Sequence, residues 1–136
     1  METATNTERM HADAKTGAMC SGGILIALYN AAIRFAQDGR DQITAGDTRT
    51  AGVTLGRVYS IIAELAASLD HDKAPELCDN LEKIYSSMLE GLIAADAKMD
   101  ANRLNSIITS LRDLRNTWAQ ALAQVAADEA QIPAIA

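Results

Sequence analysis

Apolar residues recur at intervals of three and four along four separate segments, and this spacing constrains the fold more than any other feature of the chain. In the first segment the series is Leu25, Leu28, Ala32, Phe35 and Ala36. Such spacing gathers apolar side chains on one face of an α-helix. The sustained apolar–polar alternation of half-buried strands does not occur between the turn signals. The sequence therefore predicts an all-α fold.

Turn and capping residues divide the helical pattern into four pieces. The expected helices span residues 22–43, 48–69, 75–97 and 100–127. Gly46 suits the left-handed conformation that ends a helix, and Asp47 can begin the next one. Pro75 suits a first helical turn, and Asp100 is a good N-cap. Four helices of similar length with short connections predict an antiparallel, up-down four-helix bundle.

The length of 136 residues indicates one structural domain. We expect a flexible N-terminal arm over 1–20, the bundle over 21–127 and a loose C-terminal tail over 128–136. The arm is rich in polar residues and poor in apolar ones, which is typical of a flexible segment. Aromatic residues make up only 4% of the chain, so the core must consist mainly of aliphatic side chains.

Charge and cysteine content bear on location and partners. The formal net charge of -6 disfavours nucleic acid, which needs a clustered basic surface, and anionic lipid. Cys20 and Cys78 form no C-x-x-C pair and are expected to be reduced thiols of a cytosolic protein. Residues 1–20 lack the apolar stretch of a secretory signal, and the apolar run 24–29 is too short to span a bilayer. We expect a cytoplasmic protein that is not inserted in the membrane.

No constellation of catalytic or metal-binding residues stands out. Both histidines, His11 and His71, fall outside the expected helices, so the inward-facing ligands of a bundle metal site are missing. A phosphotransfer histidine needs a mid-helix position, whereas His71 lies in a turn between two aspartates. Neither cysteine has a histidine or lysine near it in sequence. We therefore expect no enzyme activity, no cofactor and no metal.

The first predicted helix carries more apolar residues than one face can hold. Ile24, Leu25 and Ile26 are consecutive and cannot all point the same way at 100° per residue. Ile61 and Ile62 pose the same problem in the second helix. One interpretation is a wide core face with scattered exposed apolar residues. The other is an apolar groove that accepts an amphipathic helix of a partner.

On the second interpretation, a set of partner-binding residues can be named. The candidates are Ile26, Tyr29, Ile33, Tyr59, Ile61, Tyr85 and Met88. The residues assigned to the core are Leu28, Ile62, Leu111 and Trp118. Because successive residues of a helix are 100° apart, a shift of one residue in the helical pattern would move a side chain from the inside of the bundle to its outside.

Four segments, 21–35, 61–70, 81–96 and 104–122, together resemble the FliS family of flagellar secretion chaperones. The most specific pieces are Leu28-Tyr29 in the first segment, Ile84-Tyr85 in the third, and the spacing Leu111-x-x-Leu114-x-x-x-Trp118 in the fourth. The resemblance covers roughly residues 20–125.

The resemblance implies an antiparallel helical bundle that binds the disordered C-terminal segment of newly made flagellin, one to one. Binding would prevent premature polymerisation and keep flagellin competent for the flagellar type III export machinery. It would proceed by coupled folding and binding, without ATP or any cofactor.

Two alternatives remain open at this stage. The chain could be a non-enzymatic helical adaptor or a self-associating bundle with another protein partner. A homodimer through the apolar surface, formed when no client is bound, would mark self-association. The other alternative is an enzyme or phosphorelay domain, which phosphate incorporation at His71 would reveal.

Overall fold

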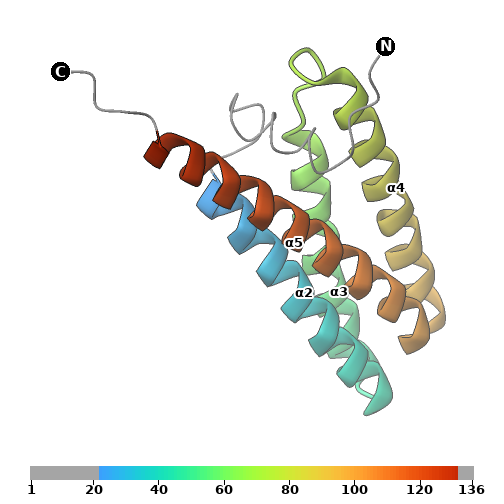
Figure 1. Cartoon of the computed structure of the whole chain (residues 1–136). Helices are drawn as coiled ribbons and strands as arrows, with labels where there is room; N and C mark the ends of the chain where they lie inside the picture. The colour runs from blue at the N-terminus through green and yellow to red at the C-terminus, as the bar shows by residue number, and fades with distance from the viewer. Residues whose placement is uncertain (1–21, 132–136) are drawn as a thin grey trace.

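A computed structural model describes residues 22–131, and these residues form four α-helices without a strand among them. The helices are α2 (Gly22–Thr44), α3 (Thr48–Ala67), α4 (Pro75–Lys98) and α5 (Ala101–Gln131). The predicted all-α bundle is confirmed (Figure 1). The arm predicted over 1–20 and residues 132–136 lie outside the described residues, so the division into arm, bundle and tail stays a prediction.

The local signals in the sequence set most of the helix ends. Gly46 follows α2 with a φ of 81°, the left-handed conformation that favours glycine. The side chain of Asp47 caps α3 by accepting a hydrogen bond from the backbone N–H of Thr50. Pro75 lies in the first turn of α4. Met99 ends α4 in the left-handed conformation although it is not glycine.

Two helix ends differ from the expectation by more than one residue. α3 stops at Ala67, before the predicted end at 69, because the chain turns at Ser68, whose hydroxyl donates to the carbonyl oxygen of Leu65. α5 continues past Ala127 to Gln131. The added residues include Glu, Ala and Gln, which all favour the helical conformation even where the apolar stripe has ended.

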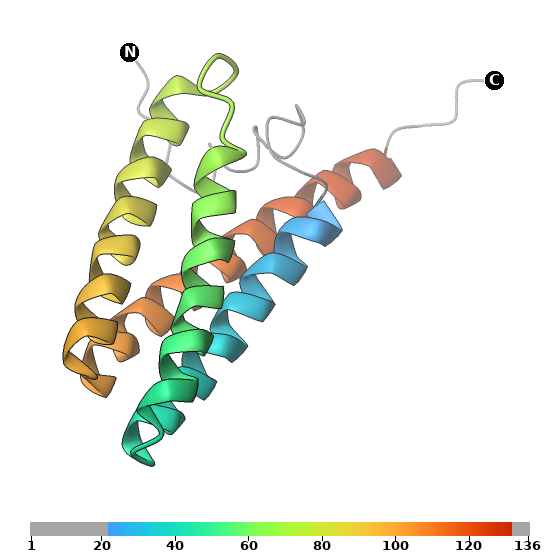
Figure 2. The same ribbon diagram turned by 180° about the vertical axis from the view of Figure 1, so that it is seen from behind.

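The helices form two pairs that cross. α2 packs against α3 and α5, and α4 packs against the same two helices. In Figures 1 and 2, α2 and α5 run side by side, whereas α4 and α5 meet at one end and diverge toward the turn between α3 and α4. The bundle is therefore splayed along one of its seams.

Side chains from all four helices fill the core. The largest fully buried side chains are Trp118, Tyr29, Tyr85, Leu25, Ile62, Leu65, Leu81, Leu92, Leu104, Ile108 and Leu111. The predicted core positions Ile62, Leu111 and Trp118 are confirmed, and Leu28 is half-buried against the same core. Burial of this aliphatic and aromatic surface is the main force that holds the helices together.

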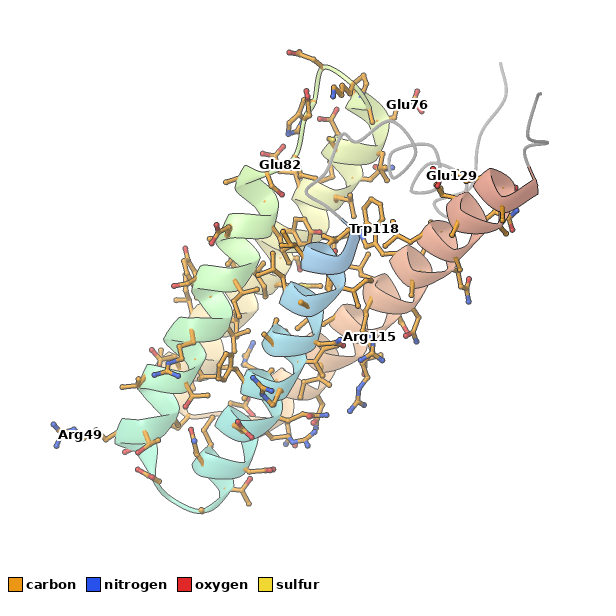
Figure 3. The ribbon with its side chains drawn as sticks, turned by 90° about the vertical axis from the view of Figure 1, so that its left-hand side faces the viewer. Arg49, Glu76, Glu82, Arg115, Trp118 and Glu129 are labelled. Atoms are coloured by element: carbon orange, nitrogen blue, oxygen red, sulfur yellow. The ribbon has the colours of Figure 1, made fainter. Side chains whose placement is uncertain are left out.

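Helix α2 is held closely on both sides. Arg115 donates a hydrogen bond to Asn30 across the α2–α5 seam at 3.1 Å, and Arg40 donates to Asn105 at the same distance. Toward α3, a Cβ atom at Gly39 would lie 2.8 Å from a methyl group of Leu55, so any larger residue would force the Leu55 side chain to shift. Figure 3 shows Arg115 in this crowded region, and Arg49 projecting away from the bundle.

Within residues 22–131, none of the helices combines the length and the apolar character needed to cross a membrane.

Candidate partner-binding grooves

A hollow of about 400 Å³ lies between α2 and α3 and is called here the α2/α3 groove. Its lining consists of Phe35, Val53, Gly56, Arg57, Ser60 and Ile61. Val53 is 60% exposed, an unusual degree for a valine in a helix that packs on two neighbours. The groove therefore offers apolar surface to solvent beside one cationic side chain.

A smaller hollow of about 120 Å³, the α3/α4 groove, adjoins the first one. It is lined by Leu55, Gly56, Tyr59, Leu92, Ile93 and Asp96. Gly56 lines both grooves, and a Cβ atom there would meet nothing within 4 Å. The glycine thus leaves an unobstructed crossing from one groove to the other.

A third hollow, the α4/α5 groove, has a volume of about 500 Å³ and lies along the diverging seam. Its lining consists of Lys83, Ile84, Ser87, Met88, Gly91, Arg103, Ser106, Ile107 and Ser110. The aliphatic side chains make an apolar floor, the serines a polar rim, and the two cations flank it. Arg103 also pairs with Asp100 at 3.3 Å.

Two of the three grooves differ in charge from the whole chain. Arg57 lines the α2/α3 groove, Lys83 and Arg103 line the α4/α5 groove, and neither lining includes a carboxylate. The α3/α4 groove has no cation and one carboxylate, Asp96. Because the complete chain carries a net charge of -6, the α2/α3 and α4/α5 grooves are apolar surfaces with cationic edges on an otherwise acidic protein, which favours partner segments with apolar and acidic side chains.

Three of the predicted partner-binding residues line these grooves. Ile61 lies in the α2/α3 groove and Tyr59 in the α3/α4 groove, where it is 39% exposed. Met88 contributes to the floor of the α4/α5 groove, although it is nearly buried. Ile26 is half-buried and packs against the core outside these linings. Contact of any of them with a partner stays a prediction.

The other three candidates lie inside the bundle. Tyr29, Ile33 and Tyr85 are buried, so the surface position expected for them is not the one they occupy. The hydroxyl groups of Tyr29 and Tyr85 form a hydrogen bond with each other and thereby link α2 with α4. Tyr29 and Ile33 lie inside because α2 packs on two helices at once and therefore buries a wide face. Helix α4, which carries Tyr85, also packs on two helices. Their contact with a partner stays a prediction.

Several groove residues were not among the candidates. Val53 and Ile93 are exposed apolar residues of α3 and α4. Each adds to the apolar residues of its helix, the same kind of surplus that marked Ile61 and Ile62, and this signal could have found both. Arg57, Ser106 and Ser110 carry no such signal, because polar residues on a helix surface are ordinary.

Among the described residues, one group of side chains has the composition of a metal site. His71, Asp79 and Glu82 lie in the α3–α4 turn and the first turns of α4, with ligand atoms within 4.8 Å of one another. Both ring nitrogens of His71 already face a carboxylate, Nδ1 at 3.2 Å from Asp79 and Nε2 at 3.8 Å from Glu82. Such solvent-exposed pairs are common at turns and contribute little to stability.

Cys78 is buried, and its thiol donates to the backbone carbonyl of Asp70 at 3.3 Å. This bond ties the α3–α4 turn to the start of α4. A buried thiol held in this way acts as a packing group, in agreement with the expected structural role.

A helical bundle with apolar surface grooves is a form that suits the binding of another polypeptide. Sequence comparison identifies the family to which the chain belongs. The family described as "Flagellar protein FliS" matches residues 4–125, and this chain belongs to that family.

Curated relatives agree with the family assignment. The chain is 30% identical over 105 residues to the flagellar secretion chaperone FliS of Escherichia coli, covering 76% of this chain and 71% of the relative. It is 24% identical over 113 residues to the protein of the same name from Vibrio cholerae, covering 83% of each. Identity to the Bacillus subtilis protein of that name is 27% over 101 residues, which is 74% of each chain.

Proposed function

We propose that this protein is a non-enzymatic export chaperone that binds the disordered C-terminal segment of flagellin in the cytoplasm. Binding prevents premature polymerisation and keeps flagellin ready for the flagellar type III export machinery. The observation that carries the proposal is the set of grooves on three seams of one small bundle, two of which meet at Gly56. Membership of the FliS family, and the names of the relatives, support the flagellar assignment.

The grooves suit a client that folds as it binds. A disordered segment gives up conformational entropy when it becomes ordered, so it must bury a large apolar area to bind at all. One hollow of a few hundred Å³ accepts only a few side chains, whereas grooves on three seams accept a segment that wraps around α3 and α4. Amphipathic helices in apolar grooves are a common mode of such recognition. A wrapped segment uses the whole surface, which gives one client per chaperone.

Calorimetric titration with the C-terminal segment of the flagellin from the same genome tests the proposal. We expect saturable one-to-one binding with a large negative change in heat capacity, the sign of apolar burial. Failure of the folded protein to bind the segment at high micromolar concentration would contradict the flagellin assignment.

A matched pair of substitutions tests whether the grooves are the binding surface. Ile93 and Ile24 are both 58% exposed, but of the two only Ile93 lines one of the three grooves described above. Ile93→Asp should weaken client binding by about tenfold, or about 1.4 kcal/mol, because it places a carboxylate where the client needs apolar surface. Ile24→Asp makes the same chemical change elsewhere and should leave affinity within about twofold. Equal losses in both variants would exclude the grooves as the site.

We also propose that the same surface supports a homodimer when no client is bound. The supporting observation is the exposure of Val53, Tyr59 and Ile93 around the two grooves that meet at Gly56. Because client and second copy would compete for one surface, titration with the client segment should convert the dimer to a one-to-one complex. Light scattering checks this, and a dimer that persists at saturating client would contradict it.

A further inference from the structure

Two arginines stack on one aromatic ring at the edge of the α2/α3 groove. The guanidinium carbon of Arg34 lies 5.5 Å from the centre of the Phe35 ring, and that of Arg57 lies 5.6 Å from it. Arg34 and Phe35 belong to α2, and Arg57 belongs to α3. The ring therefore holds two cations from different helices beside the same hollow.

Neither guanidinium has a carboxylate partner in the part of the chain that the structure describes. The ion pairs there involve Arg40, His71 and Arg103 instead. The nearest acidic residues along each helix, Asp38 on α2 and Glu64 on α3, do not pair with Arg34 or Arg57. Two like charges held near one ring repel each other unless an anion lies close to them.

The groove beside Arg57 is largely apolar. Phe35, Val53 and Ile61 line the groove beside Arg57. A partner that fits this surface must bring apolar side chains to the hollow and a negative charge to its edge. Guanidinium groups bind carboxylates through paired, charge-assisted hydrogen bonds. Stacking on Phe35 positions both groups in advance, so less conformational entropy is lost when a carboxylate binds.

We propose that the α2/α3 groove binds an amphipathic helical segment that brings acidic side chains to the pair Arg34 and Arg57. Apolar side chains of the segment pack on Phe35, Val53 and Ile61. The proposal rests on the proposed function, in that the segment belongs to the flagellin client. It deepens that function by assigning an acidic anchor to one groove.

The double variant Arg34→Gln/Arg57→Gln tests the acidic anchor. Its matched control is Lys73→Gln/Arg112→Gln, which removes two exposed positive charges that line none of the grooves. Both variants are titrated with the flagellin C-terminal segment at low and at high salt. Wild-type affinity should fall with salt, because ions screen the charge pairs.

The arginine variant should bind about tenfold more weakly at low salt and lose most of the salt dependence. The affinity of the control variant for the segment should stay within about twofold of the wild-type affinity at both salt concentrations. If the arginine variant binds as tightly as wild type and keeps the same salt dependence, the acidic anchor is overturned while the chaperone function stands. If the wild-type protein does not bind the segment, both proposals fall.

A double-mutant cycle locates the carboxylate. Each Asp or Glu of the segment is replaced in turn by Asn or Gln, and each peptide is titrated with wild type and with the arginine variant. The paired carboxylate is the one whose loss weakens binding to wild type but not to the variant. If no acidic position behaves in this way, the proposal is overturned. It is also overturned if the arginine variant changes only self-association, measured by light scattering, because the occupant is then a second copy of this chain.

Discussion

Helix α5 takes part in two seams that differ in how closely they pack. Against α2 it lies side by side, held by the hydrogen bonds Arg115–Asn30 and Arg40–Asn105 at 3.1 Å each. Against α4 it diverges and leaves the α4/α5 groove of about 500 Å³. Figure 3 shows Arg115 and Trp118 on the same helix, in the part of α5 that runs beside α2. Helix α5 thus has a closely packed side toward α2, called here the closed side, and a diverging side toward α4, called the open side.

The difference teaches that close packing is concentrated on one seam of the helix, while the other seam leaves surface free. The closed side excludes solvent and fixes the relative position of the helices through direct contacts. The open side has two small residues of α5, Ser106 and Ser110, at positions where larger side chains would fill the space. A bundle of this size can give up contacts on one seam only because the other seams are well packed.

Removal of Trp118 should have the largest effect on the closed side. Trp118 is fully buried and lies between Arg115 and Leu122, two residues of α5 that reach α2. Trp118→Ala should lower the free energy of unfolding by about 3–5 kcal/mol, through lost apolar burial and the cavity left behind. Urea unfolding followed by circular dichroism measures this, since the substitution removes the only tryptophan.

Trp118→Phe is the matched control. The indole N–H finds no hydrogen-bond partner among the described residues, so phenylalanine keeps most of the packing and loses no bond there. Trp118→Phe should lower the free energy of unfolding clearly less than Trp118→Ala does. Equal losses would show that this position depends on the full size of the indole ring.

Two glycine-to-alanine substitutions should change stability in opposite directions. At Gly39 the new methyl would lie 2.8 Å from Leu55, so overpacking should destabilise the fold by about 1 kcal/mol after the gain in helix propensity. At Gly56 nothing lies within 4 Å, so Gly56→Ala should stabilise by about 1 kcal/mol. Thermal unfolding of both variants measures the contrast. If the two substitutions shifted the unfolding temperature in the same direction, the contrast between the packed contact at Gly39 and the open groove at Gly56 would be contradicted.

The interior link between Tyr29 and Tyr85 should contribute less than the packing of the closed seam. Tyr29→Phe leaves the ring in place and removes one partner of the hydrogen bond, which should cost about 1 kcal/mol of unfolding free energy. Tyr85→Phe should cost a similar amount, and the double variant less than the sum of the two. Urea titrations of the three variants measure the coupling, and strict additivity would contradict a direct link between α2 and α4.

The smallest effect is expected on the open side. Ser87 is exposed at the rim of the α4/α5 groove. Ser87→Ala should change the free energy of unfolding by no more than about 0.5 kcal/mol, because no packed contact is lost. A larger loss in urea unfolding would mean that this rim supports the fold as the closed seam does.

The sequence was sufficient to predict the helices but not their rotation. Spacing of apolar residues, Gly46, Asp47 and Pro75 are local signals, and they place three turns correctly. Whether Tyr29 points inward depends on α3 and α5, which flank α2 but are distant in sequence. The end of α5 was missed because helix propensity, rather than an apolar stripe, extends it to Gln131.

The groove residues also divide into those that a local sequence pattern predicts and those that depend on contacts between helices. Ile61 could be predicted as a groove residue because it directly precedes Ile62, and two consecutive residues of a helix cannot both face the core. Arg57 could not, since what distinguishes it is its position over the ring of Phe35, a residue on another helix. A functional surface built between helices depends on tertiary contacts that no single segment of sequence contains.

The position of Gly56 at the junction of two grooves has a consequence for how a client would be held and released. A segment bound on one side of the glycine keeps its next residues at a high effective concentration near the other side, so the second contact forms as an intramolecular step. The combined affinity then exceeds that of either groove alone. Release follows the reverse course, one groove at a time, so a weak pull on one end suffices to detach a tightly bound segment.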